Sequence, residues 1–336
     1  MYLDSSVFIS LALLFGIAAN FRAMDGYTFL RIMITATETR LGIVFAVAVV
    51  AAVFSPFVLN DVVVLILTPV LVRYARQFKV DVAPLVVAEV SFVNIASSLT
   101  PYGNPQNLLL WQTTGISAIG FVLGTWLPLL VSALLVSGAL IIVTRGRHYP
   151  KDFPASLKVS LPLAYLVAVG VTIFALDTLG APGVVAIALG FAFGFPFALK
   201  SPRRLAEEFD YRSLAILVVL IASVAFVAGA FEPLLAPYVS SAVAGNEPYS
   251  ALFIGLTSNL ISNVPATQLI LGTVTVPALA APRIAVEAGL AGNITPIGSL
   301  ANILALLIVR RSGLPIKRTI LLQLAVGIVS FLPAFL

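Results

Sequence analysis

The sequence predicts an all-α polytopic membrane protein built as an inverted repeat, in which each half contains a re-entrant helical hairpin and a broken transmembrane helix. Three observations predict this fold class: the composition, a motif that occurs twice, and a one-sided distribution of basic residues. Of the 336 residues, 60% are apolar and 10% are charged. Soluble domains are less apolar and more highly charged than this. A bilayer solvates apolar surface directly, so the chain is predicted to cross a membrane several times.

The repeated motif interrupts two apolar segments. Residues 99–109 read LTPYGNPQNLL and residues 294–304 read ITPIGSLANIL, with Thr, Pro, Gly, Asn and the final Leu at matching positions. Because Pro lacks a backbone donor and Gly loosens the backbone, each copy is predicted to break its helix and leave backbone groups unpaired within the membrane. Such groups are tolerated beside a cavity or a ligand. Paired broken helices are typical of the central site of secondary transporters.

The remaining elements follow from the length of the apolar segments, since a crossing helix needs about 17–25 residues. Two crossings are the broken helices, near 82–112 and 281–309. The apolar segments 41–75 and 248–277 have polar centres, and we expect them to form re-entrant hairpins that enter and leave by one face. Uninterrupted crossings are predicted near residues 4–21, 117–144, 157–176, 181–199, 213–231 and 318–335.

The basic residues support this arrangement, because Lys and Arg of short loops stay on the cytoplasmic side of a membrane. With two non-crossing hairpins, all 19 Lys and Arg residues except Arg283 fall on the same side. This places the chain in the cell (plasma) membrane with both termini outside. The first hairpin then opens to the cytoplasm and the second to the exterior.

The predicted elements divide the chain into three parts. The first inverted repeat spans residues 1–145, connecting scaffold helices span residues 146–212, and the second repeat spans residues 213–336. An odd number of crossings separates the first helices of the two repeats, so the repeats have opposite orientations. Inverted repeats support alternating access to a site near the middle of the membrane.

The composition excludes several classes of protein. The chain has no Cys and a single His, His148, which lies in a basic loop. Redox chemistry and metal sites built from thiolates or several histidines are therefore excluded, and no cofactor is expected apart from bound Na⁺. The net charge of +5 comes from residues assigned to cytoplasmic loops, so we expect no nucleic-acid partner. No nucleophile–base pair or metal-ligand set stands in an apolar segment, so the chain is not predicted to be an enzyme.

The candidate site combines the two hairpin tips with the two breaks. Amides at the starts of the second half-helices, near Asn104 and Ser299, present the positive ends of helix dipoles to an anion or a polar neutral solute. Amide, hydroxyl and carbonyl oxygens suit a small cation such as Na⁺, with Asn60 and Asn263 as candidate ligands. The alternative is that these side chains only cap the broken helices or bond to neighbours. The predicted substrate-binding residues are Asn60, Thr100, Gly103, Asn104, Asn263, Thr295, Gly298 and Ser299. The predicted ion-coupling residues are Asp61, Asn60, Asn107, Ser262, Asn263 and Asn302.

Three acids stand in apolar surroundings: Asp61, Glu89 and Glu287. A carboxyl group removed from water can carry a proton, and Asp61 is the best candidate because it adjoins Asn60 at the first tip. The alternative for Asp61 is a structural hydrogen bond at the turn. Glu89 is expected to reach a cytoplasmic basic group, and Glu287, four residues after Arg283, to lie at the membrane interface. No Lys or Arg falls inside a predicted span, so an anion would depend on helix dipoles, amides and bound Na⁺.

These motifs resemble those of the arsenite-permease branch of the ion transporter superfamily, which also contains NhaD-type Na⁺/H⁺ antiporters and divalent anion/Na⁺ symporters. The matching segments are Asn60-Asp61 with ILTP at 66–69, SNVP at 262–265 and GNITPIGSLA at 292–301. The GNPQN segment at 103–107 is most similar to uncharacterised "anion permease" members. The resemblance implies that the tips and the breaks line cation and substrate sites, and that scaffold helices form a homodimer.

Together these features predict a secondary active transporter of a small inorganic or carboxylate anion, coupled to Na⁺ or H⁺ by alternating access. Its expected partners are the anion, the coupling ion, the lipid bilayer and a second copy of the chain. Two alternatives within transport are proton-coupled efflux of arsenite or antimonite and Na⁺/H⁺ antiport. Outside that class, an ion channel is the main alternative, because re-entrant segments also build filters. A repeat inverted within one chain favours alternating access over a fixed pore.

Overall fold

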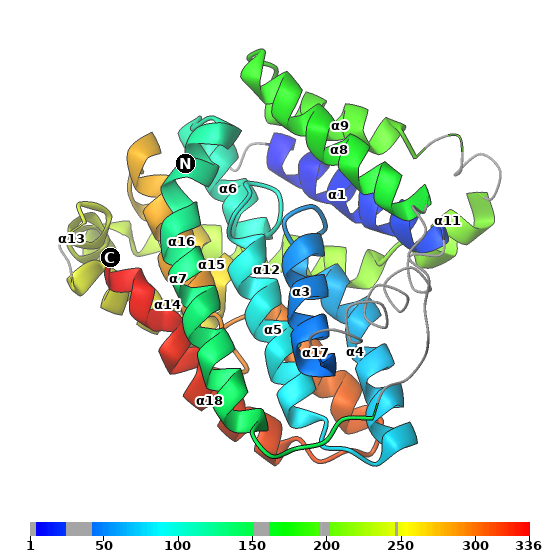
Figure 1. The fold of residues 1–336 in the computed structure, drawn as a ribbon. Coiled ribbons are helices and arrows are strands. Elements are labelled where there is room, and N and C mark those ends of the chain that lie inside the picture. Colours follow the sequence, from blue (N-terminus) through cyan, green and yellow to red (C-terminus); the bar gives the residue numbers. More distant parts are fainter. Residues whose placement is uncertain (1–4, 25–41, 151–160, 195, 197–201, 246–247) are drawn as a thin grey trace.

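The computed structural model describes residues 5–24, 42–150, 161–194, 196, 202–245 and 248–336, and within them it is helical and contains no strand (Figure 1). The predicted all-α class is confirmed. The first helices are α1 (Ser5–Ala23), α3 (Ile43–Phe54), α4 (Asn60–Phe78), α5 (Ala83–Ser97), α6 (Pro105–Thr114) and α7 (Ala118–Thr144). They are followed by α8 (Leu161–Thr178), α9 (Gly183–Ala192), α11 (Pro202–Glu208), α12 (Tyr211–Ala230) and α13 (Glu232–Val243). The last are α14 (Tyr249–Ile261), α15 (Asn263–Thr273), η1 (Ala278–Ala280), α16 (Ala281–Ala291), α17 (Leu300–Arg311), α18 (Lys317–Phe331) and η2 (Leu332–Phe335).

Four helices of the described residues are long and apolar enough to cross a membrane: α1, α7, α12 and α18 continued by η2. Each coincides with a predicted crossing. Helix α8 overlaps the predicted crossing 157–176 and ends two residues beyond it, whereas α9 lies within the predicted crossing 181–199 and is shorter than that segment. Residues 157–160, 195 and 197–199 of those crossings lie outside the described part of the chain.

Both copies of the repeated motif interrupt a helix, as Pro and Gly within the copies predict. The first separates α5 from α6 and the second separates α16 from α17. The polar centres of the predicted hairpins are breaks as well. Residues 55–59 separate α3 from α4, whereas Ser262 alone, at a φ of 75°, separates α14 from α15.

Helices from the first part of the chain pack against helices from the last part. Helix α4 packs against α17, and α15 packs against α6, so each tip helix contacts the distant broken helix. Helices α14 and α15 pack against each other, while α3 packs mainly along α5. The division of the chain at residues 145 and 212 and the inverted relation of the two repeats stay predictions.

Helices α5 and α16 form the buried centre of the molecule. Every residue of α5 is buried, and so is every residue of α16 except Arg283. In contrast, α7 exposes large apolar side chains such as Leu123 and Ile142, which are 66% and 75% exposed. An apolar surface of this kind suits contact with lipid tails. The polar side chains of α5 and α16 are therefore held away from the surface by the outer helices.

Candidate functional site

A cavity of about 430 Å³ lies between the two tips, α12 and the start of α17. Its polar lining consists of Asn60, Asp61, Asn104, Ser262 and Asn263. The remaining lining is apolar and comes from α12, α14, the start of α15, α17 and the break before α17. Among the described residues, no Lys or Arg lines it. Both predicted tips and the first break therefore meet at one cavity.

The first tip is tied to the first break through its backbone. Asn60 begins α4, and its backbone N–H donates to the carbonyl oxygen of Gly103 at 3.0 Å. The Asn60 side-chain oxygen accepts from the backbone N–H of Asp61 at 2.9 Å. Since the first N–H groups of a helix have no partner inside the helix, these bonds satisfy two of them. The tip is thereby fixed with its helix N-terminus at the cavity.

The second tip repeats this arrangement. The backbone N–H of Asn263, the first residue of α15, donates to the carbonyl oxygen of Gly298 at 3.0 Å. The Asn263 side-chain oxygen accepts from the backbone N–H of Val264 at 2.9 Å. Two segments far apart in sequence thus make the same pair of hydrogen bonds, with Asp61 at one tip and Val264 in the equivalent place at the other.

The two breaks are also held by equivalent asparagines. The Asn107 side-chain amide donates to the carbonyls of Ser97 (3.0 Å) and Thr100 (2.8 Å). The Asn302 side-chain amide donates to the carbonyls of Gly292 (2.5 Å) and Thr295 (3.0 Å). These carbonyls are freed where the helices end, and the two asparagine amides supply donors to them.

Three polar atoms of lining residues have no hydrogen-bond partner within the described part of the chain: Asp61 Oδ1, Asn104 Nδ2 and Asn263 Nδ2. The three residues are at most 3% exposed. Buried polar groups without partners are costly, so two unpaired donors and one unpaired acceptor at one cavity indicate a place for a polar ligand. Asn104 caps α6, so three helix N-termini, those of α4, α6 and α15, direct their positive ends to the same place.

Other predicted site residues do not line the cavity and form hydrogen bonds with neighbouring segments. Thr100 donates to the carbonyl of Pro56 at 2.6 Å. The Thr295 hydroxyl accepts from the backbone N–H of Gly298 at 3.1 Å. Ser299, the N-cap of α17, donates to the side-chain oxygen of Asn94 at 3.1 Å. The predicted residues that do not line the cavity are Thr100, Gly103, Asn107, Thr295, Gly298, Ser299 and Asn302.

Asn94, near the end of α5, is a central residue that the sequence analysis missed. It is fully buried, and its side-chain oxygen accepts from Ser299 and, at 3.4 Å, from Asn60. Its side-chain nitrogen donates to the side-chain oxygens of Asn293 (2.9 Å) and Asn302 (3.0 Å). Asn94 therefore connects the first tip with the second break. An amide in an otherwise apolar membrane helix is a signal that could have identified it.

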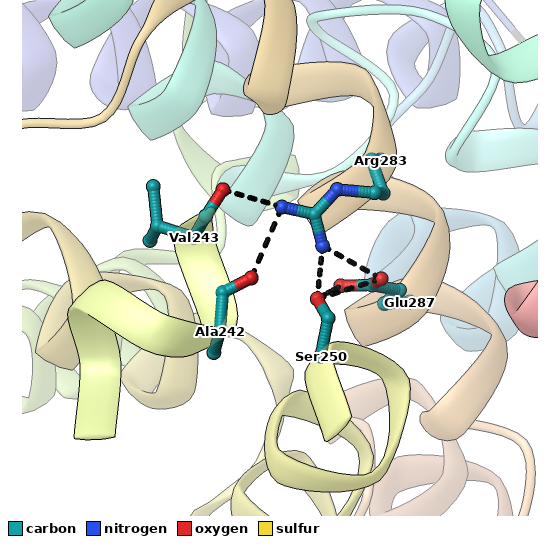
Figure 2. Close-up of polar contacts among 5 residues, drawn as sticks. All are labelled: Ala242, Val243, Ser250, Arg283 and Glu287. Atoms are coloured by element: carbon teal, nitrogen blue, oxygen red, sulfur yellow. Dashed lines mark hydrogen bonds and ion pairs between the residues drawn. The ribbon is translucent and has the colours of Figure 1, made fainter. Parts of the chain in front are cut away.

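The two other acids differ from each other. Glu89 was expected to reach a cytoplasmic basic group, and this expectation is wrong: Glu89 is fully buried and accepts from the Thr68 hydroxyl. The carboxylate is too deep for its short side chain to reach a loop. Glu287 forms an ion pair with Arg283 at 2.9 Å, and Figure 2 shows both beside Ser250. Its predicted place at the membrane interface stays a prediction.

In the described part of the chain, long apolar helices and two interrupted helices surround a cavity that has buried polar groups on its wall, and this arrangement is typical of a membrane transporter. The comparison with known families agrees. Residues 2–288 match the citrate transporter (CitMHS) family, and the chain belongs to this family. The family lies within the ion transporter superfamily, so the resemblance found in the motifs is confirmed.

Individual relatives are transporters or membrane proteins. The inner membrane protein YbiR of Escherichia coli is 32% identical over 281 residues, which cover 81% of this chain and 70% of YbiR. The silicon efflux transporter LSI3 of rice (Oryza sativa) is 33% identical over 96 residues, or 29% of this chain and 20% of LSI3. Among solved structures, the YdaH transporter of Alcanivorax borkumensis matches with a TM-score of 0.49 at 18% identity, covering 98% of this chain and 82% of YdaH.

Proposed function

We propose that the protein is a secondary active transporter that moves a small inorganic or carboxylate anion, coupled to H⁺ or Na⁺, by alternating access to the cavity between the two tips. The observation that carries this proposal is the convergence of three helix N-termini and two unpaired amide donors, Asn104 Nδ2 and Asn263 Nδ2, on one cavity. Helix N-termini attract anions, and amide nitrogens donate to anionic oxygens.

Asp61 suggests how an ion is coupled to the anion. Its carboxylate lines the same cavity as the two amide donors, so a charged Asp61 would repel an anion there. A proton on Asp61, or Na⁺ between Asp61 and the substrate, removes this repulsion. In the described part of the chain no group of three His, Asp or Glu side chains comes together. A bound Na⁺ would therefore be held by one carboxylate with amide, hydroxyl and carbonyl oxygens, as is common for hard cations.

A second candidate function is proton-coupled efflux of arsenite or antimonite. The observation that favours it is the absence of Lys and Arg from the lining formed by the described residues, together with the unpaired Asp61 oxygen. A neutral hydroxylated acid would donate to Asp61 and accept from the two amides, without any need for a basic side chain. Na⁺/H⁺ antiport is the third possibility, and it would use Asp61 without a second solute.

Thermal stability of the purified protein in detergent tests these candidates, because a ligand that binds only the folded state raises stability. The panel contains NaCl, steps of pH, arsenite, sulfate, phosphate, citrate and succinate. Stabilisation by Na⁺ that deepens with an anion supports symport, and stabilisation by arsenite without Na⁺ supports proton-coupled efflux. The matched variant Asn263→Ser should lose much of the stabilisation. If no anion stabilises the protein and Na⁺ and pH act alone, antiport replaces both proposals.

We also propose that both termini lie outside the cell and that the scaffold helices form a homodimer. The chain has no Cys, so single cysteines report sidedness without background. Thr113→Cys should react with an impermeant maleimide from outside intact cells, and Ser312→Cys only after lysis. The reverse pattern would invert the proposed orientation.

A further inference from the structure

Two buried acids in the molecule have the same hydroxyl contact and different charge environments. The Thr68 hydroxyl lies 2.9 and 3.0 Å from the two carboxylate oxygens of Glu89. The Ser250 hydroxyl lies 2.9 and 3.0 Å from those of Glu287. Glu89 and Glu287 are 0% and 1% exposed, so both carboxyl groups are removed from the protein surface. Glu89 and Glu287 can therefore be compared as two carboxyl groups that are equally buried and that each contact one hydroxyl group.

The difference is a cation. Arg283 donates to Glu287 at 2.9 Å and to Ser250, and its other nitrogen donates to the carbonyls of Ala242 (3.1 Å) and Val243 (2.7 Å) (Figure 2). This guanidinium balances the charge of Glu287. Around Glu89, the polar contact within the described chain comes from the Thr68 hydroxyl.

The elements that pack against α5 supply no cation to Glu89. Helices α3 and α7 carry no charged residue. The cations of α4, α17 and α18 have exposed side chains, and these residues are Arg73, Arg76, Arg310, Arg311, Lys317 and Arg318. On α16, Arg283 is bound to Glu287. The other acid on α4 is Asp61. It lies in the first turn of that helix, about two turns before Thr68.

We propose that Glu89 and Thr68 form a proton-binding site, separate from Asp61, that is occupied in this conformation and empties when α4 moves away from α5. A hydroxyl has one hydrogen and cannot satisfy two carboxylate oxygens, and an isolated charge removed from water becomes neutral instead. Binding forms an O–H bond on a Glu89 oxygen, and release returns that proton to water.

The position of Thr68 links this proton to the tip. Thr68 lies on α4, the helix that begins with Asn60 and Asp61, while Glu89 lies on α5, the helix that carries Asn94. A displacement of α4 would therefore separate the Thr68 hydroxyl from Glu89 and change the cavity at the same time. Pro69 directly follows Thr68 and removes one backbone hydrogen bond from α4, which makes this turn a point where the helix can bend. This link rests on the proposed transport function, whereas the occupied proton site does not.

Infrared difference spectroscopy of the protein in liposomes at neutral pH tests the site without any substrate. The C=O stretching band of a protonated carboxyl group should be present in the wild type and absent in Glu89→Gln, which preserves the hydrogen bond to Thr68. Thr68→Val should shift the band to higher frequency. Glu287→Gln should leave it unchanged, because Glu287 is ionised beside Arg283. A spectrum that Glu89→Gln does not alter, or a band that Na⁺ removes, would overturn the proposal.

A transport measurement then tests the link to α4. With citrate, succinate, phosphate and arsenite as probes, Glu89→Gln should keep the stabilisation seen for the wild type and move fewer protons per substrate during uptake into dye-loaded proteoliposomes. Proton movement equal to that of the wild type would overturn the link. If no probe stabilises the wild type, the proposed function fails, while the infrared result still decides whether Glu89 holds a proton.

Discussion

The two tips of the cavity make equivalent hydrogen bonds and differ in charge. In each, an Asn begins a helix, donates its N–H to the carbonyl of a break glycine at 3.0 Å, and accepts from the next residue at 2.9 Å. The next residue is Asp61 at the first tip and Val264 at the second. The hydrogen bonds that fix the tips therefore do not require a charged residue, and the charge of Asp61 is found at the first tip and not at the second. The repeated part forms the cavity, and the part that is not repeated offers a group that can bind a proton.

The largest expected effect is the loss of coupling at the charged tip. Asp61→Asn keeps the size of the side chain and removes its titration, so proton-driven transport by the purified protein in proteoliposomes should lose its dependence on pH. The wild type should transport faster as pH falls, because protonation of Asp61 removes its repulsion of an anion. Val264→Asn places the same amide at the uncharged tip and should leave the pH profile unchanged. A purely Na⁺-coupled mechanism would instead keep the pH profile in both variants.

The next effect compares the two glycines of the breaks. A Cβ at Gly103 would lie 2.5 Å from the carbonyl oxygen of Ser97, and one at Gly298 would lie 2.9 Å from that of Gly292. Both contacts are with backbone, which cannot rotate away. Gly103→Ala should therefore destabilise by about 3 kcal/mol and Gly298→Ala by about 1–2 kcal/mol, as in overpacked cores.

Thermal unfolding in detergent measures this difference, and Gly138→Ala is its control. Gly138 lies in α7 with nothing within 4 Å of the added carbon, so Ala there should be neutral or slightly stabilising. Equal midpoints for Gly103→Ala and the control would show that the first break relaxes, and that its tight contact with α5 is not required.

A smaller effect distinguishes the asparagines that hold the breaks. Asn107→Leu leaves two buried carbonyls without their donor and should cost about 2 kcal/mol. Asn302→Leu leaves the Gly292 carbonyl without its donor, whereas the Thr295 carbonyl still accepts from Gly298 and Gln323. It also removes one acceptor of the Asn94 amide, so it should likewise cost about 2 kcal/mol, with part of that cost arising at Asn94. Double-mutant cycles with Asn94→Ala, measured by thermal unfolding, test whether part of the stability lost in Asn302→Leu comes from its hydrogen bond with Asn94. Coupling of Asn94 with Asn107 as strong as with Asn302 would contradict it.

Local chemistry explains which parts of this structure could be predicted. Pro and Gly act on their own backbone, so the repeated motif predicted both breaks, and α5 ends at Ser97, just before it. The apolar lengths predicted α1, α7, α12 and α18 because hydrocarbon thickness requires them. Asn104 was expected at the start of a half-helix, and it is the N-cap of α6.

Contacts between distant segments could not be predicted in this way. The four hydrogen bonds of Asn94 depend on the meeting of α5 with α4 and with the second break, which no local pattern specifies. Glu89 was assigned a cytoplasmic partner because its depth depends on the packing of α5 at the centre of the fold. The apolar wall that α12 contributes to the cavity, including Leu217 and Leu220, follows from the packing of α12 against α15.

The smallest expected effect separates ligand binding from folding at the first break. Asn104 has two functions: its Oδ1 accepts from the N–H of Gln106 at 3.3 Å as a helix cap, and its Nδ2 has no partner in the described chain. Ser is an equally good cap, so Asn104→Ser should change the unfolding midpoint of the ligand-free protein very little. It removes the amide donor, and loss of one charge-assisted hydrogen bond should weaken anion binding about tenfold, or about 1.4 kcal/mol. Titration of the stabilising anion by thermal shift measures both quantities. Asn263→Ser is the matched change at the second tip. An equal loss in both variants would show that the first break and the second tip hold the anion together, and a loss in one alone would assign the anion to that residue.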